Sequence, residues 1–137
     1  MVILSVDYGD VRTGIAVCDK MEMLASPVTV IEEWNRDKLC EKICTIAKER
    51  KAQQLVLGLP KNMDGSEGES ALGAREFGAK LAEASGLPLD FQDERGTTVT
   101  AHSFLNETNT RGKKRKAVVD TVSAVIILQD FIDSRKK

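Results

Sequence analysis

The stretch VILSVDYGDVRTGIAV, residues 2–17, decides the fold of this 137-residue chain. Mostly apolar residues lead to Asp7, two glycines then bracket Arg12, and apolar residues resume. A strand, a short glycine-containing turn and a second strand are typical of a β-hairpin. A carboxylate at the end of a strand that reads as buried is costly unless something pairs with it. Asp7 is therefore either a turn residue or part of a site.

The hairpin is followed by alternating strand and helix patterns. The expected elements in chain order are strands at 1–7, 13–19 and 25–31, a helix at 35–51, a strand at 52–60, a helix at about 66–85, a strand at 88–94, a short helix at 97–107, a loop at 108–116 and a long helix at 117–134. This β-β-β-α-β-α-β-α-α order predicts an α/β fold with a mixed five-stranded sheet and helices on both faces. The absence of a repeat or linker in the sequence predicts a single domain over 1–137.

Four residues predict where elements begin and end. Pro27 suits a strand start or an edge strand, because it cannot donate to a central ladder. Asn35 is a candidate N-cap. Ser66 and the glutamate three residues later have capping-box spacing and are expected to open the second helix. Gly86 is expected to end that helix.

The composition limits the classes of protein to consider. The apolar content of 42% indicates a globular chain, and no apolar run approaches the roughly 18 residues that span a bilayer. The N-terminus lacks a signal-peptide pattern, so a cytoplasmic protein without a membrane partner is expected. Three cysteines are an odd number, which argues for reduced thiols. One tryptophan, one tyrosine and four phenylalanines make base stacking a minor expectation.

Charge is unevenly placed although the net charge is only −1. The run RGKKRK, residues 111–116, has five cations in six residues. Such a run is either a solvated loop or a patch that holds phosphates.

Three carboxylates stand out by position. Asp7 and Glu94 end the first and the last expected strands, and Asp120 lies on a helix that is apolar nearly all round. An ionised, unpaired Asp on such a helix costs several kcal/mol, so Asp120 is either an N-terminal acid favoured by the helix dipole or a member of a site. If the three converge, they make sense as ligands of divalent cations. Oxygen ligands without histidine suit Mg²⁺ or Mn²⁺, and paired ions of this kind hydrolyse phosphodiesters.

Four motifs occur in order at suitable spacing: DYGDVRTGIAV, LVLGLPKNMDGSEG, DERGTT and VVDTVSAVIILQDFID. Together they closely resemble the YqgF (RuvX) family, relatives of RuvC-type Holliday-junction resolvases, over essentially the whole chain. The resemblance implies a ribonuclease-H-like fold and a nuclease that matures the 5′ end of the 16S rRNA precursor. It matches the catalytic and metal-binding positions, for two Mg²⁺ or Mn²⁺ ions, to Asp7, Glu94 and Asp120. It also implies that a substrate cleft is lined by Arg12, Asn62, Asp64 and Arg95, while the basic run offers Lys113, Lys114, Arg115 and Lys116 to flanking phosphates.

Three alternatives remain open at this point. Resolution of branched DNA is the second activity proposed for the family, and it needs a dimer, whereas trimming an rRNA precursor does not. The chain is therefore expected to be a monomer or a weak homodimer that binds nucleic acid. Actin-like ATPases share the core but need two such domains to enclose a nucleotide. A non-catalytic module that binds RNA or assembly factors is the third alternative.

Overall fold

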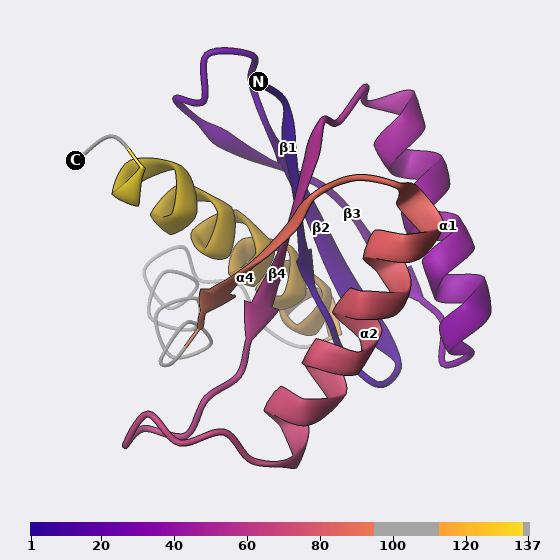
Figure 1. Cartoon of the computed structure of the whole chain (residues 1–137), viewed down its shortest axis with the longest axis vertical. Coiled ribbons are helices and arrows are strands. Elements are labelled where there is room, and N and C mark those ends of the chain that lie inside the picture. The colour runs from indigo at the N-terminus through magenta and orange to yellow at the C-terminus, as the bar shows by residue number, and fades with distance from the viewer. Residues whose placement is uncertain (95–112, 136–137) are drawn as a thin grey trace.

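The computed structural model describes residues 1–94 and 113–135, and the side chains of 113–120 lie outside the described part. The described elements, in chain order, are β1 (Ile3–Asp7), β2 (Arg12–Cys18), β3 (Ala25–Glu32), α1 (Arg36–Glu49), β4 (Gln54–Leu59), α2 (Glu69–Ser85), β5 (Leu89–Asp93) and α4 (Lys113–Ser134) (Figure 1). The short helix expected at 97–107 falls outside the described residues.

The strands form one five-stranded sheet in the order β3-β2-β1-β4-β5. β1 pairs antiparallel with β2 and parallel with β4, and β4 pairs parallel with β5. The predicted hairpin and the mixed sheet are thus confirmed. Pro27 lies on the edge strand β3, opposite Ala16, where the register with β2 shifts. An edge position leaves the missing N–H of proline without consequence for a central ladder.

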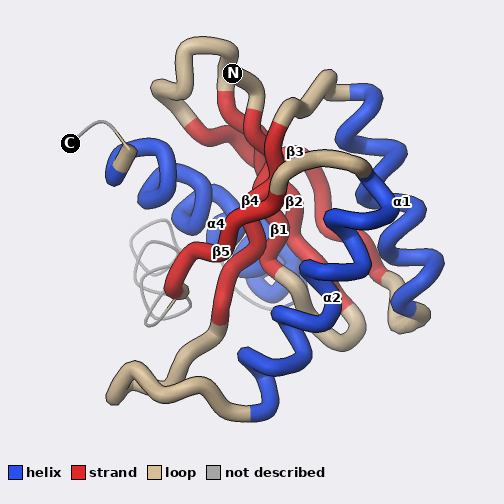
Figure 2. The backbone as a smooth tube through the Cα atoms, viewed as in Figure 1, coloured by secondary structure: helices blue, strands red, loops and turns tan. Residues whose placement is uncertain are grey.

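Helices cover both faces of the sheet, as predicted for an α/β fold (Figure 2). α1 and α2 pack on one face in a core that includes Leu4 and Val6 of β1. α4 packs on the other face in a core that includes Ile3. Successive side chains of a strand point to opposite faces. β1 is therefore buried from both sides, and its odd-numbered residues face α4.

Two of the predicted boundary residues are confirmed. The Asn35 side chain accepts a hydrogen bond from the amide of Lys38 at 3.0 Å, as an N-cap does. Gly86 ends α2 with φ of 70°, a left-handed conformation that glycine adopts without a steric penalty.

Two boundary predictions are wrong. Ser66 does not cap α2: its hydroxyl donates to Asp64 at 2.6 Å, and the N-cap position is Gly68. A serine bonds most readily to an acceptor close by in the chain, and here that acceptor lies before the helix. α4 begins at Lys113 rather than at 117, so part of the basic run is helical rather than a loop. Lysine and arginine are good helix formers, which explains the earlier start.

The Asn35 cap leads to a stability prediction. Asn35→Ala should lower the free energy of unfolding by about 1 kcal/mol, because the Lys38 amide loses its acceptor. Asn35→Asp should retain most of the stability, since its carboxylate accepts the same bond. Urea denaturation followed by circular dichroism measures both, and equal midpoints for the alanine variant and the wild type would contradict the prediction.

In the described part of the chain, no helix combines the length and the apolar character that crossing a membrane requires.

Candidate active site at the carboxyl ends of the parallel strands

Asp7 and Glu94 meet at one edge of the sheet. β1, β4 and β5 run parallel, so their carboxyl ends share that edge. Asp7 is the last residue of β1, and Glu94 directly follows β5. The Glu94 amide donates to the carbonyl of Leu59 at 3.2 Å, which fixes its backbone to the end of β4. Its side chain is in hydrogen-bonding contact with that of Asp7.

Gly58 lets Glu94 reach across the intervening strand. β4 lies between β1 and β5, so a side chain at position 58 would stand between the two carboxylates. A Cβ on Gly58 would lie 2.8 Å from Oε2 of Glu94 and 2.6 Å from Cδ1 of Ile127 in α4. Because glycine has no side chain at this position, the Glu94 carboxylate can occupy the space beside Gly58.

The contact with Asp7 contributes to a raised pKa of Glu94. Burial first, then the charge of Asp7, the hydrogen bond with Asp7 and the charge of Asp93 raise the pKa of Glu94 to about 8. A metal-free protein therefore holds Glu94 largely protonated at neutral pH. Two carboxyl groups that would repel one another if both were ionised are the arrangement expected of ligands for a cation.

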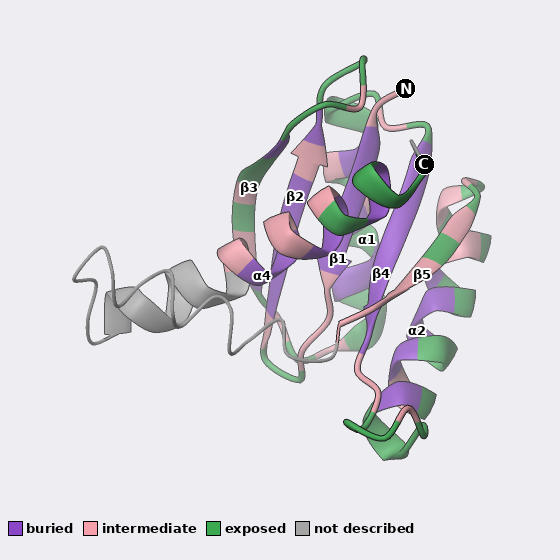
Figure 3. Cartoon of the chain, turned by 90° about the vertical axis from the view of Figure 1, so that its left-hand side faces the viewer, coloured by how far each residue is buried: buried purple, intermediate pink, exposed green. Residues whose placement is uncertain are grey.

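The direction of α4 brings position 120 toward the same edge. At the far edge of the sheet, Arg135 pairs with Glu22 at 3.1 Å, and the Gln129 side chain accepts from the amide of Ala25 at 2.9 Å. Earlier in the helix, the Ser5 hydroxyl donates to the carbonyl of Ala124 at 2.7 Å. From Arg135 to Ala124 the helix α4 thus runs toward the end of β1, and its C-terminus lies near the N-terminus of the chain (Figure 3).

Asp120 is one helical turn before Ala124 and two turns before Ile127, which lies near Gly58. Its side chain lies outside the described part of the chain, so the structure brings together two of the three predicted carboxylates, and the third stays a prediction. Asp120 is seven residues inside α4 rather than three or four. This distance weakens the reading of Asp120 as a dipole-favoured N-terminal acid, since that effect fades beyond the first turn.

A pocket of about 390 Å³ adjoins the carboxylate pair. Its lining comes from the β1–β2 turn, the starts of α1 and α2, and the loop residues beside them: Tyr8, Gly9, Asp10, Arg36, Pro60, Glu69, Ser70, Gly73 and Glu94. Gly9 is required by the turn itself, because a Cβ there would lie 2.2 Å from the carbonyl oxygen of Arg12.

The sequence analysis missed Tyr8 and Arg36. The Tyr8 ring stacks on Phe77 with centroids 4.4 Å apart, and the Arg36 guanidinium lies 5.2 Å from the Tyr8 centroid. The buried Tyr8 hydroxyl has no hydrogen-bond partner among the described residues. These contacts link residues 8, 36 and 77, which are far apart in the sequence. The only local signal was that Tyr8 directly follows Asp7 at the end of β1; nothing local pointed to Arg36.

The side chains of the predicted loop residues Asn62 and Asp64 both form hydrogen bonds with Ser66 in the same turn. The Asn62 side chain donates to the Ser66 hydroxyl at 2.9 Å, and the Asp64 carboxylate accepts from the Ser66 amide at 2.9 Å. Gly65 has φ of 91°, which this turn requires of a glycine. In the described contacts, both side chains shape the loop before α2 rather than reach the carboxylate pair.

Of the remaining predicted substrate contacts, the structure describes Arg12 but not the side chains of the others. Arg12 opens β2 opposite Glu32, one strand away from Asp7. Arg95 lies outside the described residues, as do the side chains of the basic positions in the first turn of α4: Lys113, Lys114, Arg115 and Lys116.

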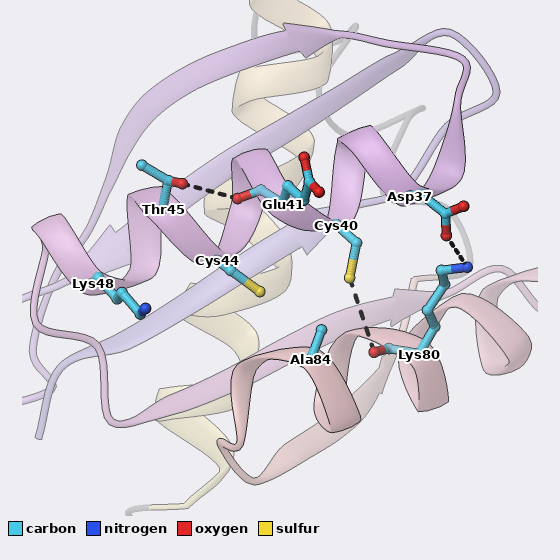
Figure 4. Close-up of a pocket in the computed structure, with 8 residues that line it drawn as sticks. All are labelled: Asp37, Cys40, Glu41, Cys44, Thr45, Lys48, Lys80 and Ala84. Atoms are coloured by element: carbon cyan, nitrogen blue, oxygen red, sulfur yellow. Dashed lines mark hydrogen bonds and ion pairs between the residues drawn. The ribbon is translucent and has the colours of Figure 1, made fainter.

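A larger pocket of about 800 Å³ lies between α1 and α2, away from the carboxylates (Figure 4). Cys40 and Cys44 of α1 line it, and Lys80 of α2 pairs with Asp37 across it. The cysteines are free thiols, as predicted. Burial, and secondarily Cys44, raises the pKa of the Cys40 thiol to about 11, so Cys40 is not an activated nucleophile. The contact between Asp7 and Glu94 is therefore the stronger candidate for a site.

Oxygen donors of this kind fit a hard divalent cation. Among the described side chains, no three acids, cysteines or histidines group closely enough to hold a metal ion. The candidate third ligand, Asp120, is outside that set.

Curated relatives match this chain over essentially its full length. The curated sequences include one from Leuconostoc mesenteroides, 43% identical over 144 residues that cover 100% of this chain and 98% of the relative. One from Clostridium botulinum Eklund 17B is 39% identical over 137 residues and covers all of both chains. Each is named "Putative pre-16S rRNA nuclease".

Solved structures show the same fold. Thermus thermophilus RuvC in complex with a Holliday junction substrate superposes with a TM-score of 0.60 at 13% identity, covering 99% of this chain and 96% of that one. The fowlpox virus resolvase in complex with Holliday junction DNA gives 0.63 at 11% identity and covers all of both chains. The predicted ribonuclease-H-like fold is therefore confirmed. The family model RuvX, described as Holliday junction resolvase, matches residues 1–134, and the chain belongs to this family.

Proposed function

We propose that this protein is a metal-dependent endonuclease that processes the 5′ end of the 16S rRNA precursor. The observation that carries the proposal is the contact between Asp7 and Glu94 at the carboxyl edge of the sheet, in a chain of the RuvX family. The names of relatives about 40% identical over the whole chain support the choice of substrate. In this proposal one ribonuclease-H-like domain performs the reaction.

Asp7, Glu94 and Asp120 are proposed to hold two Mg²⁺ or Mn²⁺ ions. Asp7 and Glu94 are already in contact, and the direction of α4 together with its periodicity supports Asp120 as the third ligand. When bound, such ions supply an activated water and stabilise the leaving oxygen of a phosphodiester. The raised pKa of Glu94 means that a proton must leave this carboxyl before it can serve as a ligand.

The pocket beside the carboxylates is proposed to hold the substrate backbone. Arg36 brings a cation to its lining, beside the ring of Tyr8. The start of α2 also lines the pocket, and no described side chain caps its first turn. Helix N-terminal amides favour phosphate oxygens. Arg12 and the basic first turn of α4 would add affinity along the strand without reading its sequence.

Resolution of branched DNA remains the second candidate, since the fold is shared with two resolvases bound to junction DNA. A resolvase makes two paired cuts and hence acts as a dimer. Sedimentation of the protein together with cleavage of a four-way junction and of a 16S precursor end separates the two. We expect a monomer or weak dimer that cuts the precursor through many turnovers in Mg²⁺ or Mn²⁺ and not in EDTA. A stable dimer that cuts only junctions would replace this proposal by the resolvase. Tight binding without any cutting would replace it by a non-catalytic module.

Asp7→Asn should remain folded and lose metal-dependent cleavage, because one ligand loses its charge. Its circular dichroism spectrum checks the fold, and its cleavage rate on the precursor end checks the activity. The same variant excludes a contaminating nuclease. Cleavage by purified Asp7→Asn at the wild-type rate would show the proposed mechanism to be wrong.

A further inference from the structure

Trp34 is the only tryptophan of the chain, and its side chain is 76% exposed. A large aromatic ring left in water forgoes the burial that normally stabilises it. The described exposed apolar side chains fall into two groups at opposite edges of the sheet. Met21, Met23 and Leu24 lie on the β2–β3 loop, whereas Val11, Trp34, Met63 and Leu72 surround the carboxyl edge.

The backbone around Trp34 is held from both sides. The Glu33 amide donates to the carbonyl of Val11 at 2.8 Å, and the Glu33 carboxylate accepts from the Asn35 amide at 3.1 Å and pairs with Lys42 at 2.9 Å. Asn35 in turn caps α1. The ring is thus carried by a short connection whose neighbours are fixed, so little backbone entropy is lost when something binds to it.

This connection lies next to the candidate active site. Val11 belongs to the β1–β2 turn that starts directly after Asp7, and this turn and the β3–α1 connection are neighbours (Figure 2). Val11 follows Asp7 by four residues, which reach at most about 14 Å. Arg36, two residues after Trp34, lines the pocket together with Glu94. A strand whose phosphate sits at the carboxylates can therefore reach Trp34 within a few nucleotides.

Resting on the proposed nuclease function, we propose that Trp34 is a stacking platform for an unpaired base of the substrate strand. Arg36 lies two residues after Trp34, and Arg12 opens β2 opposite Glu32, so two cations lie near the ring together with the carboxylates of Glu32 and Glu33. The choice of a nucleic-acid strand as the occupant rests on the nearness of the ring to the carboxyl edge and on the proposed function. Stacking on an exposed ring accepts any base, because every base has a π-face. The scarcity of aromatics predicted a minor role for stacking, but one ring in this position is enough to hold one base beside the cleavage point.

The single tryptophan makes the test direct. A 12-nucleotide single-stranded RNA, its DNA counterpart and the same RNA as a duplex are titrated into the full-length Asp7→Asn chain, which leaves the strands intact. Anisotropy of a label on the nucleic acid measures binding, and Trp34 emission reports stacking. Both single strands should quench the emission to saturation, and the duplex, whose bases are already stacked, should not.

Substitutions then separate stacking from a structural role. In the same Asp7→Asn background, Trp34→Ala should weaken single-strand binding by about 5- to 100-fold, and Trp34→Phe should recover most of the loss. In the active chain, Trp34→Ala should raise KM with little change in kcat. Met21→Ala removes a similarly exposed apolar side chain, 74% exposed at the other edge, and should leave binding unchanged.

Saturated binding without quenching, or equal affinities for Trp34→Ala and the unsubstituted background, would overturn the stacking role. If the active wild type still cleaves the precursor in that case, the nuclease proposal stands and this inference alone fails. A wild type that neither binds nor cleaves nucleic acid would overturn both. Loss of a protein dimer in Trp34→Ala, with unchanged RNA affinity, would assign the ring to an interface between copies of the chain instead.

Discussion

Glu94→Gln is expected to make the metal-free protein more stable at neutral pH and to abolish its cleavage activity. Glutamine keeps the shape of Glu94 and can donate its amide N–H to the Asp7 carboxylate, but it carries no charge. The variant should melt roughly 5–10 °C above the wild type in EDTA at pH 7. Cleavage in Mg²⁺ should fall at least about 100-fold, because a proposed ligand is lost.

The sign follows from the raised pKa of Glu94. This carboxyl titrates near pH 8 when folded, compared with an ordinary value of 4.5. Its contribution to stability is fully present below about pH 4.5 and is lost as the pH rises from there to 8. At pH 7 the loss amounts to about 2 kcal/mol after allowance for partial solvent access. Glutamine does not titrate, so the gain should shrink toward zero near pH 4.

Calorimetric melts in EDTA at pH 4, 5.5 and 7 measure this gain. Exposed Glu83 on α2 supplies a matched control, since Glu83→Gln should shift the unfolding free energy by no more than about 0.5 kcal/mol and leave cleavage intact. Added Mg²⁺ should raise the melting temperature of the wild type more than that of Glu94→Gln. A lower melting temperature for Glu94→Gln than for the wild type at pH 7 would contradict the prediction.

Local sequence patterns were enough to predict much of the fold. The hairpin around Asp7, the edge strand with Pro27 and the cap at Asn35 each follow from chemistry within a few residues, and the structure has them as predicted. Ser66 shows where local reasoning fails. Its spacing to Glu69 fits a capping box, but Asp64 is an equally local competitor and takes the hydroxyl.

The candidate site depends on strand order, which no local pattern contains. Asp7 and Glu94 could be singled out as strand-end acids, but their contact requires β4 to lie between them and to carry no side chain at Gly58. In the sequence Gly58 reads as the close of a strand before Pro60. Arg36 and Tyr8 join the site through a contact across 28 positions of sequence. Helix periodicity singled out Asp120, and it stays a prediction because its side chain lies outside the described part.

The role of Gly58 can be tested by giving it one methyl group. Gly58→Ala should lower cleavage by about 100-fold while costing only about 1 kcal/mol of stability. The new Cβ would meet Oε2 of Glu94 at 2.8 Å and Cδ1 of Ile127 at 2.6 Å, both at the ends of flexible side chains. These can rotate away at modest cost. The carboxylate then leaves Asp7, and a displacement of about 1 Å is enough for a loss of this size.

Gly78→Ala is the matched control, because the same methyl group would meet a rigid neighbour on the opposite face of the sheet. Its Cβ would lie 2.7 Å from Cζ of Phe91 and 3.3 Å from Cδ2 of Leu57, in the core beneath α2. We expect a larger stability loss, about 2–3 kcal/mol, with cleavage retained well below the melting temperature. Urea denaturation and the cleavage rate at 20 °C measure both variants. Gly58→Ala should thus lose mainly activity, whereas Gly78→Ala should lose mainly stability. Equal loss of cleavage in both would mean that general packing, and not the path of Glu94 over β4, governs the reaction.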